Sequence, residues 1–257
     1  MHLVAAGAGA RPFLTNFFID GERQMKLGFL IPTSEEAVGI PKECRVSAGF
    51  GAGKSSACAS AADLIFNRHC DTVVIWGTAG CLTDALQTGD IVVATRTAHK
   101  DFSLEPLFGT RGLGDVPDFS EEDFWHTMDE TLARVLLESV RLVFPAHHVV
   151  PGAVCSGDIF DPASSRGNPI ERQADAVDME TSAVAEFCHR LREKRGIPVR
   201  FGTIRVLSND ASSTNASTAG GDFTQFLKMF SQMNTRLLAL QKTIEGFPPA
   251  RLERPVL

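Results

Sequence analysis

The sequence has no long basic run, no closely spaced cysteine pair and no long apolar segment. The formal net charge is −6 over 257 residues, whereas a nucleic-acid-binding surface normally shows a stripe of lysine and arginine. No apolar run approaches the roughly 20 residues that cross a bilayer. Residues 1–10 are apolar but lack a basic leader, and they predict a strand that ends in a glycine turn, not a signal peptide. We therefore expect neither a nucleic-acid partner nor a membrane partner.

The cysteine and histidine pattern excludes two further classes of protein. The six cysteines are scattered without a C-x-x-C pair, which argues against a disulfide framework and against a zinc site. The histidines show no metal spacing with a carboxylate or a thiol, so we expect no metal. Buried free thiols are typical of a reducing compartment. The sequence thus predicts a cytoplasmic location.

The apolar segments that are present are short, β-branched and separated by helical patterns. With 44% hydrophobic residues, the chain can bury one large core. Strands without polar alternation are typical of a sheet covered by helices on both faces, so the pattern predicts an α/β fold. We expect one domain over residues 1–245 and a proline-rich tail over 246–257. The expected strands are 2–6, 45–49, 72–78, 89–95, 148–155 and 198–207; the expected helices are 54–68, 121–143 (with Ser120 as its N-cap), 180–195 and 222–243; residues 25–41 could contain a hairpin, and 104–119 form a loop.

Residues 175–186 place an apolar strand end directly against a helix start, with two carboxylates and a thioether at the junction. A helix N-terminus carries unpaired N–H groups and a partial positive charge, which favours an ionised Glu180. A carboxylate with both oxygens free can accept hydrogen bonds from two adjacent hydroxyl groups, as on a ribose. The same residues also fit an ordinary helix start with acidic residues in its first turn. This segment alone leaves both interpretations open.

Five other motifs accompany this segment along the chain. They are Gly51-Ala-Gly-Lys54, Val73-Val-Ile-Trp-Gly-Thr-Ala-Gly80, Gly89-Asp-Ile-Val-Val93, Ser156-Gly-Asp-Ile-Phe160 and Arg205-Val-Leu-Ser-Asn209. With Val-x-Met-Glu at 177–180, they resemble, in order and at nearly the same spacing, those of the purine nucleoside phosphorylase/nucleosidase superfamily. The resemblance covers residues 3–242 and is nearest the methylthioadenosine/adenosylhomocysteine nucleosidase and futalosine hydrolase branch. It implies a single domain with a mixed, twisted, partly closed sheet, cleavage of the N-glycosidic bond of a purine nucleoside without a cofactor, and a homodimer or larger oligomer.

The resemblance also assigns substrate-binding residues. Glu180 would bind the ribose hydroxyls and Met179 would lie along the ribose. Phe160 would stack on the purine and Phe223 would close the pocket from the last helix, since aromatic faces suit a flat base. Both phenylalanines also fit simple core packing. The full set of expected substrate contacts is Thr78, Ala79, Gly80, Phe160, Asp178, Met179, Ser208 and Phe223.

The sequence departs from the family pattern at Asn209. The family usually protonates the purine at N7 with the Asp of Arg-x-x-Ser-Asp, whereas this chain has Asn209 followed by Asp210. An amide can donate to N7, but it cannot act as a general acid. Asparagine at this place resembles the 6-oxopurine members, which favours a hypoxanthine- or guanine-type leaving group. A one-residue shift that brings Asp210 inward would restore adenine, and Asn209 could also simply form a turn.

The nucleophile is less well defined by the sequence. By resemblance, nucleosidases place a Glu soon after the first strand to activate water, and residues 7–13 contain no carboxylate. Gly7 and Arg11 have the Gly-x-x-x-Arg spacing with which the phosphorylases bind phosphate, but the second phosphorylase Arg falls at Ile75. A single arginine makes a poor dianion site. The overall resemblance favours hydrolysis, whereas Arg11 and the missing Glu favour phosphorolysis. We expect hydrolysis, with phosphorolysis as the alternative.

Two further alternatives come from a different class of motif and from the missing carboxylate. Residues 48–55 fit a relaxed phosphate-loop pattern, in which Lys54 would reach the terminal phosphate of a nucleotide triphosphatase. The first glycine of that pattern is alanine, no later strand ends in a convincing metal-binding Asp, and the family's own glycine turn falls at this place. A non-catalytic nucleoside-binding protein would keep Glu180 and Phe160 without a water-activating group. The sequence favours a purine nucleosidase with Asn209, Asp210 and Glu180 as catalytic residues.

Overall fold

Eight strands form one sheet among the residues that the structure, a computed structural model, describes: 25–101, 125–159, 169–210 and 223–247. Three strands extend a central ring of five. β1 (Leu27–Ile31) pairs in parallel with β3 of the ring and with β2 (Val46–Ala48) on its other side. β5 (Trp125–Thr127) pairs antiparallel with β4 of the ring.

The central five strands return to their starting point. β3 (Thr72–Cys81) pairs antiparallel with β7 (Ala176–Asp178), and β7 pairs in parallel with β6 (Val149–Ser156). β6 continues in parallel to β4 (Ile91–His99), which pairs antiparallel with β8 (Arg200–Asp210). β8 then pairs in parallel with β3. This closure confirms the expected mixed, partly closed sheet of an α/β domain.

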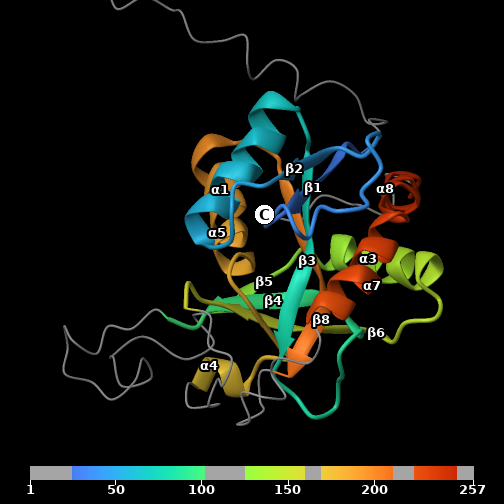
Figure 1. Cartoon of the computed structure of the whole chain (residues 1–257). Helices are drawn as coiled ribbons and strands as arrows, with labels where there is room; N and C mark the ends of the chain where they lie inside the picture. Colours follow the sequence, from blue (N-terminus) through green and yellow to red (C-terminus); the bar gives the residue numbers. More distant parts are fainter. Residues whose placement is uncertain (1–24, 102–124, 160–168, 211–222, 248–257) are drawn as a thin grey trace, which may run out of the picture.

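Helices cover the sheet on two sides (Figure 1). One group packs its small and apolar residues against one face, and a second group packs larger apolar residues against the other. No helix in the described part of the chain is both long and apolar enough to span a bilayer. The first group is α1 (Lys54–Ala62), its π-helical continuation η2 (Asp63–Asn67) and α5 (Thr181–Arg195); the second is α3 (Glu130–Val143), α7 (Phe223–Asn234) and α8 (Leu237–Glu245); α4 (Pro169–Arg172) is a single short turn.

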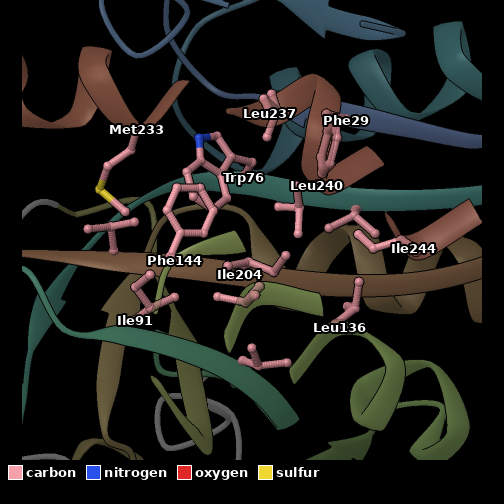
Figure 2. Close-up of a cluster of buried hydrophobic side chains, with 14 of the residues drawn as sticks. Phe29, Trp76, Ile91, Leu136, Phe144, Ile204, Met233, Leu237, Leu240 and Ile244 are labelled. Carbon is pink, nitrogen blue, oxygen red and sulfur yellow. The ribbon is translucent and has the colours of Figure 1, made fainter. Parts of the chain in front are cut away.

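Successive residues of β3 point to opposite faces and are buried on both. Val74 and Trp76 belong to the apolar cluster under α3, α7 and α8, whereas Val73 and Ile75 belong to the cluster under α1 and α5. Figure 2 shows the first cluster, in which aromatic and aliphatic side chains surround Trp76. Burial on both faces explains why this strand has no polar alternation in the sequence.

Two predicted helices have different bounds in the structure. The helix expected at 121–143 begins only at Glu130, because the Asp129 side chain caps it by accepting from Leu132 N at 2.9 Å. Residues 125–127 form β5 instead, and Ser120 lies outside the described residues. The helix expected at 222–243 is two helices separated at Thr235–Arg236, since Asn234 and Thr235 have poor helix propensity and both pieces pack on the same core.

The N-terminal part of the described chain also corrects an expectation. Residues 25–41 contain no hairpin: β1 at 27–31 is followed by turns and pairs only with parallel neighbours. The strand expected at 2–6 and the loop expected at 104–119 lie outside the described residues. β1 is therefore the strand whose carboxyl end contributes to the site described below.

Candidate active site

A cavity of about 310 Å³ lies where β1, β3, β7 and β8 end. The structure brings seven of the residues singled out from the sequence to its wall: Thr78, Ala79, Gly80, Asp178, Met179, Glu180 and Ser208. Arg11 and Phe160 lie outside the described residues. For Asn209, Asp210 and Phe223 the structure describes the backbone alone, in β8 and at the start of α7.

Glu180 stands at the junction of β7 and α5 and is only 3% exposed. Its Oε1 accepts a hydrogen bond from Gly53 N at 2.9 Å, and its Oε2 accepts one from Arg205 Nη2 at 3.0 Å. The expectation that both oxygens are free is therefore wrong. Each carboxylate oxygen has a second lone pair, so Glu180 can still accept from ribose hydroxyls in the cavity.

The burial of Glu180 determines its ionisation. Burial raises the pKa of Glu180 to about 6; the Arg205 guanidinium and the Gly53 N–H oppose this rise, and the charge of Asp178 adds to it. The position at the start of α5 was expected to favour the ionised form, but desolvation outweighs that effect. Because neutral pH is still above this pKa, the ionised form predominates there.

Asp178 supports the junction. Its Oδ1 accepts from Glu180 N and from Thr181 N, both at 3.2 Å, so it satisfies N–H groups at the start of α5. The same oxygen accepts from the hydroxyl of Ser156. Because its oxygens are engaged by the protein, Asp178 positions Glu180 and is less suited to bind a ligand itself.

Arg205 is fully buried below these carboxylates. Its Nη2 contacts Oδ2 of Asp178 at 2.5 Å and Oε2 of Glu180 at 3.0 Å, and its Nη1 donates to Thr78 O at 3.3 Å. Burial alone would lower the pKa of Arg205, but Asp178, Glu180 and Glu36 together raise it. The guanidinium of Arg205 therefore stays charged, because two carboxylates compensate its charge in the buried site. The sequence interpretation named Arg205 only as the first residue of the motif at 205–209 and did not predict its contacts with Asp178 and Glu180.

Glu36 is a carboxylate of the cavity wall that the sequence interpretation missed. It lines the cavity and is 6% exposed. Its Oε1 accepts from Thr78 N at 2.7 Å, and its Oε2 accepts from Thr33 N and Thr33 Oγ1 at 3.2 and 3.0 Å. By resemblance, such a carboxylate was expected within residues 7–13, after the strand expected at 2–6. The strand that leads into the site is β1, and the run Leu27–Ile31 followed by Pro32 was the signal that could have located it.

The glycine turn before α1 binds protein carboxylates. Gly53 has a φ of 101°, a region that disfavours other residues, and its N–H is the group that donates to Glu180. Lys54 N donates to Asp158 Oδ1 at 3.0 Å, and the Lys54 ammonium forms an ion pair with Asp101. These donors are the ones that a phosphate loop would offer to a nucleotide. Their use inside the protein argues against the triphosphatase alternative.

A register shift marks the end of β8. Ala79 pairs with Leu207 and Gly80 pairs with Asn209, so Ser208 is an extra residue between two paired positions. The Ser208 hydroxyl donates to Ala79 O at 3.3 Å. Such an irregularity interrupts the alternation of side chains along a strand. The sequence alone therefore could not decide between Asn209 and Asp210 as the residue that faces the cavity.

The described residues show no cluster of three or more His, Cys, Asp or Glu side chains that could hold a metal ion. All six cysteines are free thiols, and burial raises the pKa of Cys44 to about 11. The ionisable groups that line the cavity are carboxylates and the ammonium of Lys100, which is paired with Glu171 at 2.9 Å.

Known proteins share this fold and this sequence pattern. A 5′-methylthioadenosine/S-adenosylhomocysteine nucleosidase of Anoxybacillus flavithermus is 30% identical over 194 residues, which cover 74% of this chain and 76% of the relative. The crystal structure of the nucleosidase of the same name from Neisseria meningitidis, in complex with methylthio-immucillin-A, has a TM-score of 0.64 at 25% identity and covers 85% of this chain and 99% of its own.

The futalosine hydrolase of Helicobacter pylori has the same fold, with a TM-score of 0.64 at 21% identity over 85% of this chain and 97% of its own. A family model described as the phosphorylase superfamily matches residues 39–243. Since that match spans most of the chain and agrees with the closed sheet and with the order of the motifs, the protein belongs to the phosphorylase superfamily.

Proposed function

We propose that this protein hydrolyses the N-glycosidic bond of a purine nucleoside and releases the free base. Glu36 is the observation that carries the proposal. A buried carboxylate faces the same cavity as Glu180 and lies within five residues of the end of β1. This is where a nucleosidase of the family needs a group to activate water. The missing carboxylate was, with Arg11, an argument for phosphorolysis, and it was also the argument for a non-catalytic binding protein; the buried carboxylate of Glu36 in the cavity supports hydrolysis instead.

The geometry supports a division of roles in the cavity. Glu180, fixed by Gly53 and Arg205, accepts the ribose hydroxyls, and Met179 lies along the sugar. Glu36, held in place by Thr33 and Thr78, takes a proton from water as the water oxygen bonds to C1′. The C1′–N9 bond breaks, and its electron pair leaves with the purine. The two carboxylates also favour the positive charge that develops on the sugar in the transition state.

Asn209 and Asp210 are proposed to act on the leaving purine from the end of β8. Gly80, Ser208 and Met179 line the cavity around that strand end, so the base would lie there. If Asn209 faces the base, its amide hydrogen-bonds a 6-oxopurine, and the leaving base takes its proton from water. If Asp210 faces it, a carboxylic acid protonates N7 of an adenine. We favour the 6-oxopurine, with Phe160 stacked on the base and Phe223 closing the pocket.

Release of free base from a nucleoside panel tests the proposal. The panel pairs inosine with adenosine and their 5′-substituted forms, in phosphate and in a neutral buffer of matched ionic strength. Hydrolysis predicts free ribose and equal rates in both buffers. Ribose 1-phosphate and saturation by phosphate would instead show phosphorolysis, with Arg11 as the first residue to examine.

A matched pair of variants tests Glu36 directly. Glu36→Gln keeps the shape of the side chain and removes the base, so we expect turnover to fall by at least 100-fold. Glu43→Gln is the control, because Glu43 is an exposed carboxylate of the same segment that does not line the cavity. It should stay within about threefold of wild type. Equal rates for Glu36→Gln and wild type would remove Glu36 from the mechanism.

The proposal also covers the cellular location and the oligomeric state. The free thiols support a reducing, cytoplasmic location. By family resemblance we propose a homodimer or larger oligomer in which a neighbouring loop closes the site. Light scattering coupled to size exclusion measures the oligomeric state, and a monomer that turns over nucleoside at the full rate would contradict the shared site.

A further inference from the structure

A buried asparagine connects the last turn of α7 to the turn that carries Glu36. Asn234 has no exposed surface. Its Nδ2 donates to Glu36 O at 2.7 Å and to Val38 O at 2.8 Å, and its Oδ1 accepts from Trp76 Nε1 at 2.7 Å. One side chain thus links α7, β3 and the turn that follows β1.

The partners dictate which way the Asn234 amide points. Trp76 Nε1 can only donate, so it must face the amide oxygen. The carbonyl oxygens of Glu36 and Val38 can only accept, so they must face the amide nitrogen. A flipped amide would lose all three hydrogen bonds in a site without solvent. The connection therefore has a single arrangement.

Trp76 gives this connection a rigid support. Its ring stacks between Phe144 and Phe230, with centroid distances of 5.5 and 5.6 Å. Figure 2 shows its indole within the apolar cluster, with Met233, the residue before Asn234, nearby. Trp76 also precedes Thr78 by two residues on β3, and Thr78 N donates to the carboxylate of Glu36. β3 thus holds Glu36 at both ends, the side chain directly and the main chain through Asn234.

The other hydrogen bonds of the main chain in the turn around Glu36 are local. Its internal main-chain bonds are short-range turn contacts, from Ala37 N to Ser34 O at 3.2 Å and from Val38 N to Glu35 O at 3.4 Å. Val38 itself is 59% exposed. The turn nevertheless approaches α7 closely, because a Cβ on Gly39, whose φ is +88°, would lie 2.5 Å from Ser231 O. Ala37 and Ile40 pack on the apolar core, and among the hydrogen bonds described those from Asn234 are the tertiary ones to the main chain of this turn.

We propose that Asn234 is a positioning residue that sets the place of the Glu36 carboxylate in the cavity. It touches no substrate and acts through the main chain of Glu36. This inference rests on the proposed function, in which Glu36 activates water. It also connects α7 to the residue that activates water, and Leu227 of the same helix lines the cavity.

Removal of the amide should affect catalysis more than binding. We expect Asn234→Ala to lower kcat at least tenfold while KM stays within about threefold. A small displacement of the Glu36 carboxylate lowers the rate of the chemical step but leaves the contacts to the ribose and the purine in place. Trp76→Phe keeps an aromatic ring and removes only the donor to Asn234. It should lower kcat in the same direction, by at least threefold, and it decides the question if Asn234→Ala does not fold.

Gln241→Ala is the matched control. Gln241 is another buried amide, 3% exposed, whose Oε1 accepts from Arg45 N at 3.0 Å at the other end of the α7–α8 pair. Its loss should lower the melting temperature as Asn234→Ala does and leave kcat within about twofold of wild type. A comparable loss of kcat in the control would show that both effects are merely structural.

A double-mutant cycle separates positioning from general destabilisation. If Asn234 acts through Glu36, then Asn234→Ala adds less than about twofold to the defect of Glu36→Gln. A full additional tenfold loss in the double variant, or a kcat of Asn234→Ala within twofold of wild type, overturns the inference. Failure of the proposed function looks different: the wild type then releases no base, or Glu36→Gln retains the wild-type rate.

Discussion

A Cβ atom on Gly77 would lie 2.6 Å from Nη1 of Arg205. It would also lie 3.1 Å from Oε1 of Glu36, so the guanidinium and the carboxylate both occupy the space above this residue of β3. Absence of a side chain at Gly77 therefore lets a buried cation approach the carboxylate that faces the cavity. The strand that holds Glu36 through Thr78 also makes room for it.

Gly77→Ala should impair activity by crowding these two groups. We expect kcat/KM to fall by at least tenfold, because displacement of Arg205 also disturbs its contact with Glu180. Gly202→Ala is the control: its Cβ would lie 2.5 Å from Leu136 Cδ1, in the apolar core of the same sheet. Both variants should lower the melting temperature, and only Gly77→Ala should reduce kcat/KM beyond its loss of folded protein. Equal residual activity in the two variants would contradict this role of Gly77.

Arg205→Met should destabilise the protein strongly. The substitution leaves Asp178 and Glu180 as buried carboxylates without their cation, a loss that typically costs about 3–5 kcal/mol. Urea unfolding measures it. Arg190→Met is the control, since Arg190 forms an exposed pair with Glu186 and such pairs contribute about 0–1 kcal/mol. Similar unfolding midpoints for the two variants would show that Arg205 is not the centre of the charge cluster.

Glu180→Gln should lower turnover by orders of magnitude, and its effect on stability should depend on pH. The pKa of Glu180 is about 6 when folded, above its ordinary 4.5, so the ionised carboxylate destabilises the folded protein. This cost is absent below about pH 4.5 and complete above about pH 6, and amounts to about 2 kcal/mol. Wild type should therefore gain stability relative to Glu180→Gln as pH falls from 7 to 4.5.

Glu186→Gln gives the opposite sign and serves as the control. Hydrogen bonding from Arg190 lowers the pKa of Glu186, so its ionised form stabilises the folded state and this contribution is lost on acidification. Thermal melts of the three proteins at several pH values make the comparison. A stability difference between wild type and Glu180→Gln that does not vary with pH would mean that Glu180 has an ordinary pKa.

Motif order predicted the fold and seven of the residues in the cavity wall, because β3, the β7–α5 junction and β8 are continuous segments whose side chains reach the site directly. Thr78, Met179 and Glu180 were found in this way. Glu36 was missed because no strand was expected at Leu27–Ile31, so the turn that follows this strand was not considered as part of the site. The pairing of both Glu180 oxygens could not be predicted either, since Gly53 and Arg205 are far away in the chain and meet Glu180 only through the fold.

The substitution Asn209→Asp tests the choice of base. Asn209 lies opposite Gly80, after the register shift at Ser208, at a strand end that lines the cavity. An amide can pair with a 6-oxopurine, whereas a carboxylic acid can hold a proton for N7 of an adenine. A buried hydrogen-bond mismatch costs on the order of 1–3 kcal/mol, or about one to two decades in relative rate. We expect wild type to prefer inosine-type nucleosides and Asn209→Asp to shift the kcat/KM ratio at least tenfold toward adenosine-type ones.

Asp210→Asn is the matched control for this specificity change. If Asn209 faces the base, the control should leave the ratio of inosine to adenosine within about twofold of wild type. A change of the ratio in Asp210→Asn, and none in Asn209→Asp, would mean that the irregularity at Ser208 turns Asp210 toward the cavity. In that case wild type prefers adenosine, Asn209→Asp leaves the ratio unchanged, and Asp210→Asn abolishes adenine release because the proton donor for N7 is gone.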